Sequence, residues 1–85
     1  MKSFEFVVKN PMGMHAAIAV RLIQEVSSMT SLVRITKGKQ KITATKIFAI
    51  LSLNIRCGDV MILEAVGENE ENDINRLEMF CEKHL

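Results

Sequence analysis

The residue with the clearest chemical potential in this sequence is His15, which follows a turn-forming segment and precedes an apolar helical pattern. A histidine at the start of a helix lies close to backbone N–H groups that lack partners inside the helix, and the helix dipole favours an anion there. Imidazole is also a nucleophile when neutral, and it titrates near neutral pH. These properties predict that His15 accepts and donates a phosphoryl group, held by the backbone amides of Ala16, Ala17 and Ile18. A solvated or capping histidine is the alternative.

Neither the second histidine nor the two cysteines predict a second reactive site. Cys57 and Cys81 are too far apart in sequence for a metal-ligand pair or a redox CxxC motif, so we interpret them as free thiols in a reducing compartment. His84 falls in the last turn of a predicted helix, where a cation offsets the helix dipole. The sequence therefore predicts no metal and no cofactor.

The elements that must position His15 follow from the spacing of apolar residues. Alternating patterns predict strands over residues 3–8, 32–37, 41–43 and 60–66, the middle two joined by a turn at residues 37–40. Ile18, Leu22 and Val26 form one row of a helix over residues 16–28. Thr45 is placed to cap a short apolar helix over residues 45–53. The last segment opens with acids at residues 68–73 and closes with Lys83 and His84, the charge order of a helix.

The order strand, helix, strand, strand, helix, strand, helix predicts an α/β (α+β) fold. Because every helix needs cover and each strand is apolar chiefly on one side, we expect an open-faced α/β sandwich. With 85 residues and no linker, we expect a single domain over residues 1–85. The sequence has no apolar run long enough for a signal peptide or a membrane span, and we expect a cytoplasmic monomer.

Charge is unevenly distributed although the formal net charge is only +1. No acid occurs between Glu25 and Asp59, and this interval holds six cations, Arg34, Lys37, Lys39, Lys41, Lys46 and Arg56. The molecule is therefore expected to have a basic side. Nucleic-acid binding is disfavoured because Trp and Tyr are absent and the four Phe are expected to be largely buried.

Three stretches resemble HPr, the histidine phosphocarrier of the sugar phosphotransferase system: Gly13-Met14-His15-Ala16, Lys46-Ile47-Phe48-Ala49-Ile50-Leu51-Ser52-Leu53 and Gly58-Asp59. The resemblance covers nearly the whole chain. It implies the HPr-like fold, an open-faced β-sandwich in which three helices cover one face of a four-stranded antiparallel sheet. It implies that His15 takes a phosphoryl group from enzyme I, which phosphoenolpyruvate charges, and passes it to sugar-specific IIA domains. It further implies that both partners dock on the exposed faces of the first two helices, for which we predict Val20, Gln24, Ile47, Phe48 and Leu51. The alternative for Ile47 and Leu51 is that they belong to the core.

The sequence departs from the family signature immediately after the histidine, where Ala17 and Ile18 replace an arginine and a proline. An arginine offers forked, charge-assisted hydrogen bonds to a phosphoryl group, whereas Ala17 offers only its amide. Lys46, or less directly Arg21, is a candidate substitute cation; a solvated Lys46 is the alternative. Lys46 also stands where many relatives carry a regulatory serine. A binding module with weak or no phosphotransfer is therefore the second hypothesis for function.

Overall fold

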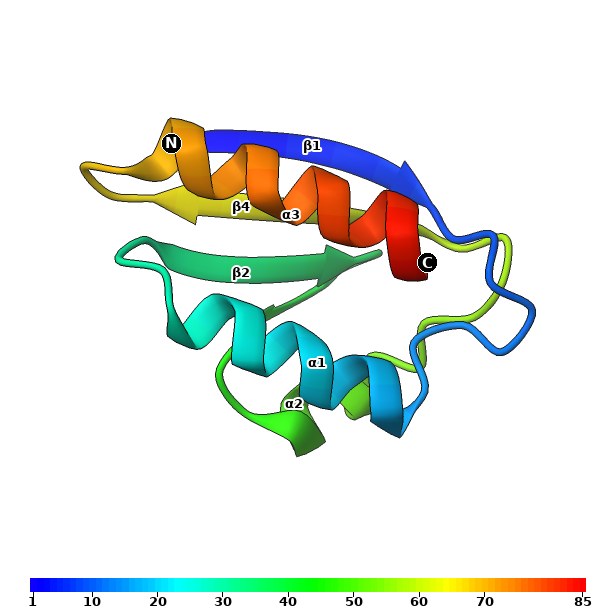
Figure 1. The fold of residues 1–85 in the computed structure, drawn as a ribbon. Helices are drawn as coiled ribbons and strands as arrows, with labels where there is room; N and C mark the ends of the chain where they lie inside the picture. Colours follow the sequence, from blue (N-terminus) through cyan, green and yellow to red (C-terminus); the bar gives the residue numbers. More distant parts are fainter.

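The computed structural model describes all 85 residues, and its element order is the predicted one. The strands and helices are β1 (Lys2–Val7), α1 (Ala16–Ser27), β2 (Leu32–Lys37), β3 (Gln40–Thr43), α2 (Ile47–Ser52), β4 (Val60–Val66) and α3 (Glu70–His84). The four strands form one antiparallel sheet in the order β1-β4-β2-β3. The three helices lie to one side of this sheet (Figure 1). The predicted open-faced sandwich is confirmed.

The register explains why β4 is the central strand of the core. Leu63 of β4 pairs with Phe4 of β1 on one side and with Ile35 of β2 on the other. Leu63 and Ile35 are fully buried under the helices. The neighbouring positions point to the other face of the sheet, as alternation along a strand requires. Helix α3 packs on β1 and β4, whereas α2 packs on α1 and β3.

The helices bury the residues that the periodicity indicates. Ile18, Leu22 and Val26 of α1 are buried, and Leu22 is wholly inaccessible to solvent. In α3, Leu77 and Cys81 are also fully buried. Removing a side chain such as Leu22 from a close-packed core costs about 2–5 kcal/mol, so these rows fix both helices on the sheet. The structure contains no helix of the length and apolarity that crossing a membrane requires.

The second helix starts later than its sequence predicts. Its N-cap is Lys46, no side chain caps it, and Thr45 belongs to the preceding turn, so the predicted Thr45 cap is wrong. The cause is the sheet. Ala44 is fully buried and its N–H donates to the carbonyl oxygen of Val33 at 2.9 Å, which extends the pairing beyond β3. Thr45 consequently lies in the turn that connects the sheet to α2.

Candidate functional site

Two loops in direct contact build the start of α1, one before it and one before β4. The N–H of Met14 donates to the carbonyl oxygen of Ile55 at 3.0 Å, and both side chains are buried. Gly13 has φ of +63°, and a Cβ atom added there would lie 2.8 Å from the Cα of Arg56 and even closer to the Ile55 carbonyl oxygen. Only glycine permits this approach. The contact fixes the position at which the chain enters α1.

His15 occupies the N-cap position of α1. Its backbone is extended, with φ of −84° and ψ of 173°, and its carbonyl oxygen accepts the first helical hydrogen bond, from Ala19 N–H at 3.0 Å. Its side chain makes no capping hydrogen bond and is half-buried. The imidazole is therefore anchored through its backbone while its ring remains accessible to a reactant.

The three amides that follow His15 donate to no other protein atom. Helical bonding begins with the N–H of Ala19, and the N–H groups of Ala16, Ala17 and Ile18 have no acceptor. The first turn of α1 contains no acidic residue, and Ala16 and Ala17 are exposed. Unpaired amides at the positive end of a helix dipole provide a place for an anion beside the His15 ring.

The acid nearest along the chain to this loop pair is already engaged. The carboxylate of Asp59 lies 2.9 Å from the Lys37 ammonium and accepts the backbone N–H of Arg56 at 2.8 Å. The Lys37 hydrogen bond, followed by the Arg56 amide, lowers the pKa of Asp59 below its ordinary value. Lys37 also donates to the carbonyl oxygen of Asn54 at 2.7 Å. These bonds stiffen residues 54–59, against which the start of α1 rests.

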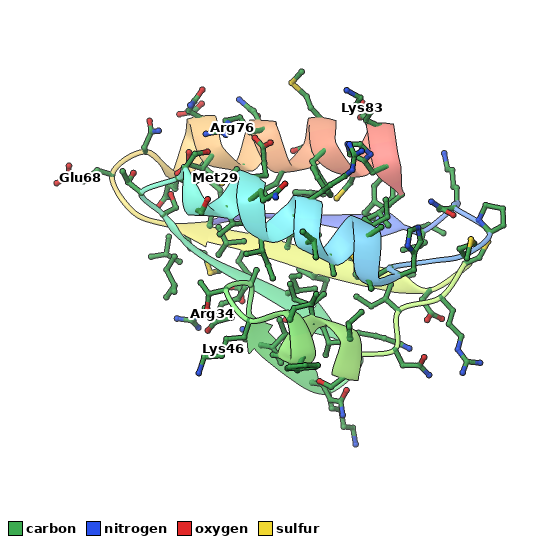
Figure 2. All side chains as sticks on the ribbon, turned by 60° about the horizontal axis from the view of Figure 1, so that its bottom comes forward. Met29, Arg34, Lys46, Glu68, Arg76 and Lys83 are labelled. Carbon is green, nitrogen blue, oxygen red and sulfur yellow. The ribbon has the colours of Figure 1, made fainter.

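The structure does not bring Lys46 to His15. Thr45 lines a small apolar hollow together with Ile23 and Val26, which belong to the second half of α1. Ile23 is about 12 Å along the helix axis from His15, at a rise of about 1.5 Å per residue. Figure 2 shows Lys46 with Arg34 and Met29 toward the end of the molecule where α1 finishes. Lys46 is exposed there.

The predicted docking residues form a surface on α1 and α2, which pack against each other. Val20 is 43% exposed and Phe48 is 83% exposed, while Gln24 is also open to solvent. Ile47 and Leu51 are half-buried and pack against the core. The expectation that all four Phe are largely buried is thus wrong for Phe48. A large aromatic side chain left almost bare on a small protein is typical of an interaction surface.

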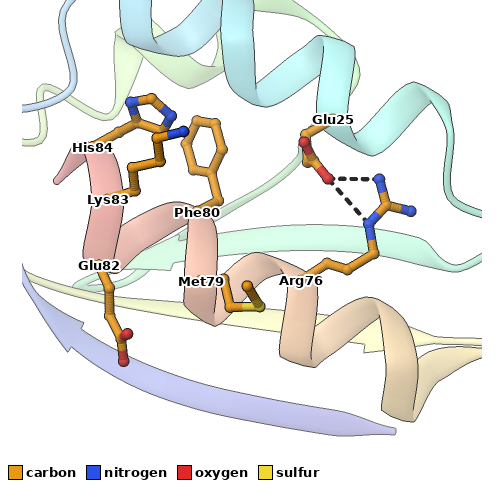
Figure 3. Close-up of a pocket in the computed structure, with 7 residues that line it drawn as sticks. All are labelled: Glu25, Arg76, Met79, Phe80, Glu82, Lys83 and His84. Atoms are coloured by element: carbon orange, nitrogen blue, oxygen red, sulfur yellow. Dashed lines mark hydrogen bonds and ion pairs between the residues drawn. The ribbon is translucent and has the colours of Figure 1, made fainter.

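The largest groove of the molecule lies elsewhere, between α1 and α3 (Figure 3), and measures about 630 Å³. At one end Arg76 of α3 donates through Nε to the Glu25 carboxylate at 3.0 Å and through a terminal nitrogen to Ser28 Oγ at 2.7 Å. At the other end the rings of Phe80 and His84 lie 4.6 Å apart. The Arg76 contacts join α3 to α1, and His15 is not among the residues that line the groove. The groove therefore does not extend the His15 site.

Comparison with known proteins agrees with this geometry. The family described as "PTS HPr component phosphorylation site" matches residues 2–83. The chain is 31% identical to the phosphoryl donor subunit DhaM of the PEP-dependent dihydroxyacetone kinase of Providencia stuartii, over 95% of this chain and 17% of that one. It is 29% identical to the phosphocarrier protein HPr of Mycoplasma pneumoniae, over 99% of this chain and 97% of that one.

The solved structures lead to the same family. The crystal structure of HPr-C-His from Thermoanaerobacter tengcongensis superimposes with a TM-score of 0.91 and 34% identity, covering 96% of this chain and 92% of that one. The chain therefore belongs to the HPr family of the phosphotransferase system. It spans about a sixth of the DhaM relative but nearly the whole length of the HPr relatives.

Proposed function

We propose that this protein is a phosphocarrier that accepts a phosphoryl group on His15 and passes it to a second protein. The observation that carries the proposal is the coincidence of an accessible imidazole with three unpartnered amides at the N-terminus of a 12-residue helix. In each transfer an unprotonated ring nitrogen of His15 forms a P–N bond while the bond from phosphorus to the donor breaks, and the donor keeps that electron pair. The reverse exchange delivers the group to the acceptor.

The partners that fit this role are enzyme I as donor and IIA domains as acceptors, in the cytoplasm. The residues Val20, Gln24, Ile47, Phe48 and Leu51 support this, because they lie on two helices that pack against each other and include an exposed aromatic beside half-buried aliphatics. Such a surface suits brief contacts in which the partner's reactive group must reach His15 and leave again. No pocket for a small-molecule substrate is needed.

One feature supports the alternative of a binding module that keeps the fold and docks partners without efficient transfer. Ala17, the second residue of α1, is exposed and offers no charge. The amides alone leave a phosphoryl dianion less well neutralised than amides combined with a guanidinium. This alternative predicts partner binding with little or no label on His15.

The test is to incubate the protein with phosphoenolpyruvate and catalytic enzyme I and to follow intact mass and acid lability. A carrier gains one acid-labile phosphoryl group, and His15→Ala abolishes the gain. His84→Ala is the matched control, because it removes the second histidine and should leave labelling unchanged. A folded protein that gains no label, although enzyme I is active on another HPr, contradicts the carrier proposal and favours the binding module.

A further inference from the structure

A phosphoryl group on His15 would carry more charge than three neutral amides neutralise, so the position of the nearest cation matters. The two loops at the site run antiparallel in direct contact. Gly13 lies against Arg56, and Met14 N–H bonds to the carbonyl of Ile55. The backbone of Arg56 is thus held two residues from His15 by a contact that tolerates no Cβ at Gly13.

The side chains at this loop pair divide into an inner and an outer set. Met14 and Ile55 point into the core, where they are 5% and 4% exposed. Their neighbours His15, Asn54 and Arg56 are accessible to solvent. The ring of His15 and the guanidinium of Arg56 therefore leave the loop pair toward the solvent.

The guanidinium of Arg56 is held by one hydrogen bond, and its other donors are free. Its Nε donates to Asn54 Oδ1 at 3.3 Å, which fixes one edge of the guanidinium. Its two terminal nitrogens make no hydrogen bond and no salt bridge. Asp59, the acid that would otherwise pair with it, binds the Lys37 ammonium and the backbone N–H of Arg56. Two donors of a rigid fork remain free for a ligand.

Other cations are less well placed. Lys46 directly follows Thr45, which lines a hollow with Ile23 and Val26 in the second half of α1. Arg21 is six residues into the helix, about 9 Å along its axis from His15, although its side chain leans back toward the helix start.

We propose that Arg56 binds the phosphoryl group on His15, together with the amides of Ala16, Ala17 and Ile18, and supplies the positive charge that Ala17 does not. The inference rests on the proposed phosphocarrier function. Asn54 orients the guanidinium through Nε, and the phosphoryl oxygens accept hydrogen bonds from the terminal nitrogens. The charge thus comes from a loop distant in sequence and not from the helix that carries the histidine.

The first arm of the test measures transfer from phosphorylated enzyme I to wild type, Arg56→Ala, Arg56→Lys, Lys39→Ala and Arg21→Ala at saturating acceptor. Arg56→Ala should slow the saturated rate by about tenfold or more, the usual effect of losing a charge-assisted hydrogen bond. Arg56→Lys should recover part of the rate. Lys39→Ala removes the same charge from an exposed turn and should leave the rate unchanged. A docking role for Arg56 would instead raise KM and spare the saturated rate.

The second arm needs no transfer. Inorganic phosphate is titrated into the ¹⁵N-labelled protein. The expected result is a joint shift of the Arg56 Nε–H resonance and the three α1 amide resonances. In Arg56→Ala the amides should bind phosphate with lower affinity. If wild type accepts no label, the phosphocarrier proposal fails, and this titration still decides on Arg56. The inference is overturned if Arg56 does not respond to phosphate, or if Arg56→Ala transfers as fast as Lys39→Ala, or if Arg21→Ala carries the loss.

Discussion

The first turns of α1 and α3 differ in what lies near the positive end of the helix dipole. At α3 the first turn holds Glu70, Glu71 and Asp73, so the helix supplies its own anions. Glu70 accepts the N–H of Gly67 at 3.1 Å, and the fully buried carboxylate of Asp73 accepts the N–H of Ser31 at 3.2 Å. Neither helix has a side-chain cap, but the first turn of α1 holds no acid, and its first three amides have no acceptor.

The acids at the start of α3 stabilise that helix, whereas the start of α1 has no anion of its own. Acidic side chains near a helix N-terminus contribute about 0.3–1 kcal/mol each, and α1 forgoes that contribution. Its position is secured instead by backbone contact at Gly13 and Met14, which occupies none of the groups facing an incoming anion. Side-chain hydrogen bonds hold the start of α3, whereas backbone contact holds the start of α1.

Breaking the backbone contact should have the largest effect. Gly13→Ala places a Cβ against the 55–56 backbone and forces an unfavourable φ, so we expect a loss of roughly 3 kcal/mol in the free energy of unfolding. Gly38→Ala is the control, because Gly38 has a similar φ of +59° but no atom within 4 Å of the added Cβ. It should lose about 1 kcal/mol. Urea denaturation measures both, and equal losses would contradict the importance of the contact.

Making α1 resemble α3 should trade transfer for stability. Ala17→Glu puts a carboxylate in the first turn, which we expect to raise the free energy of unfolding by about 0.3–1 kcal/mol. The same charge repels a phosphoryl group, so transfer to His15 should slow by about tenfold. Ala17→Gln keeps the shape without the charge and should change neither quantity by as much. Unaltered transfer in Ala17→Glu would mean that the vacant helix start does not receive the phosphoryl group.

The smallest predicted effect sharpens the comparison through pH. Because the Lys37 hydrogen bond lowers the folded pKa of Asp59, its ionised form stabilises the fold above the unfolded pKa. That contribution is lost as pH falls through the lower, folded pKa. Wild type should therefore exceed Asp59→Asn in stability at pH 7, and the difference should begin to shrink below about pH 4 and vanish only below the folded pKa. Thermal unfolding across this range measures it, and a constant difference would exclude ionisation of Asp59 as its cause.

The fold was predictable because its signals are local and periodic. The row of Ile18 and Leu22 indicates α1, and alternation around Leu63 indicates the central strand. The location of His15 at a helix start also follows from its neighbours, since Gly13 and the preceding turn residues end one element before another begins. Each of these inferences needs only residues a few positions apart.

The details of the site were not predictable because they depend on contacts distant in sequence. Nothing near Arg56 indicates that its backbone touches Gly13, and nothing near Lys46 indicates that it lies beside the end of α1 and not its start. Thr45 has the residue type of a helix cap, but the hydrogen bond from Ala44 to Val33 governs its role. The exposure of Phe48 is likewise set by tertiary packing, since a short apolar helix has no clear polar face.

The strand order also determines when the protein can fold during its own synthesis. The central strand β4 is the last to be translated, yet both β1 and β2 pair with it. At about 5–20 residues per second, β1 emerges roughly 3–12 s before the partner it needs. Until then Phe4 and Phe6 have no strand beside them, and both edges of β1 are open to pairing with another polypeptide.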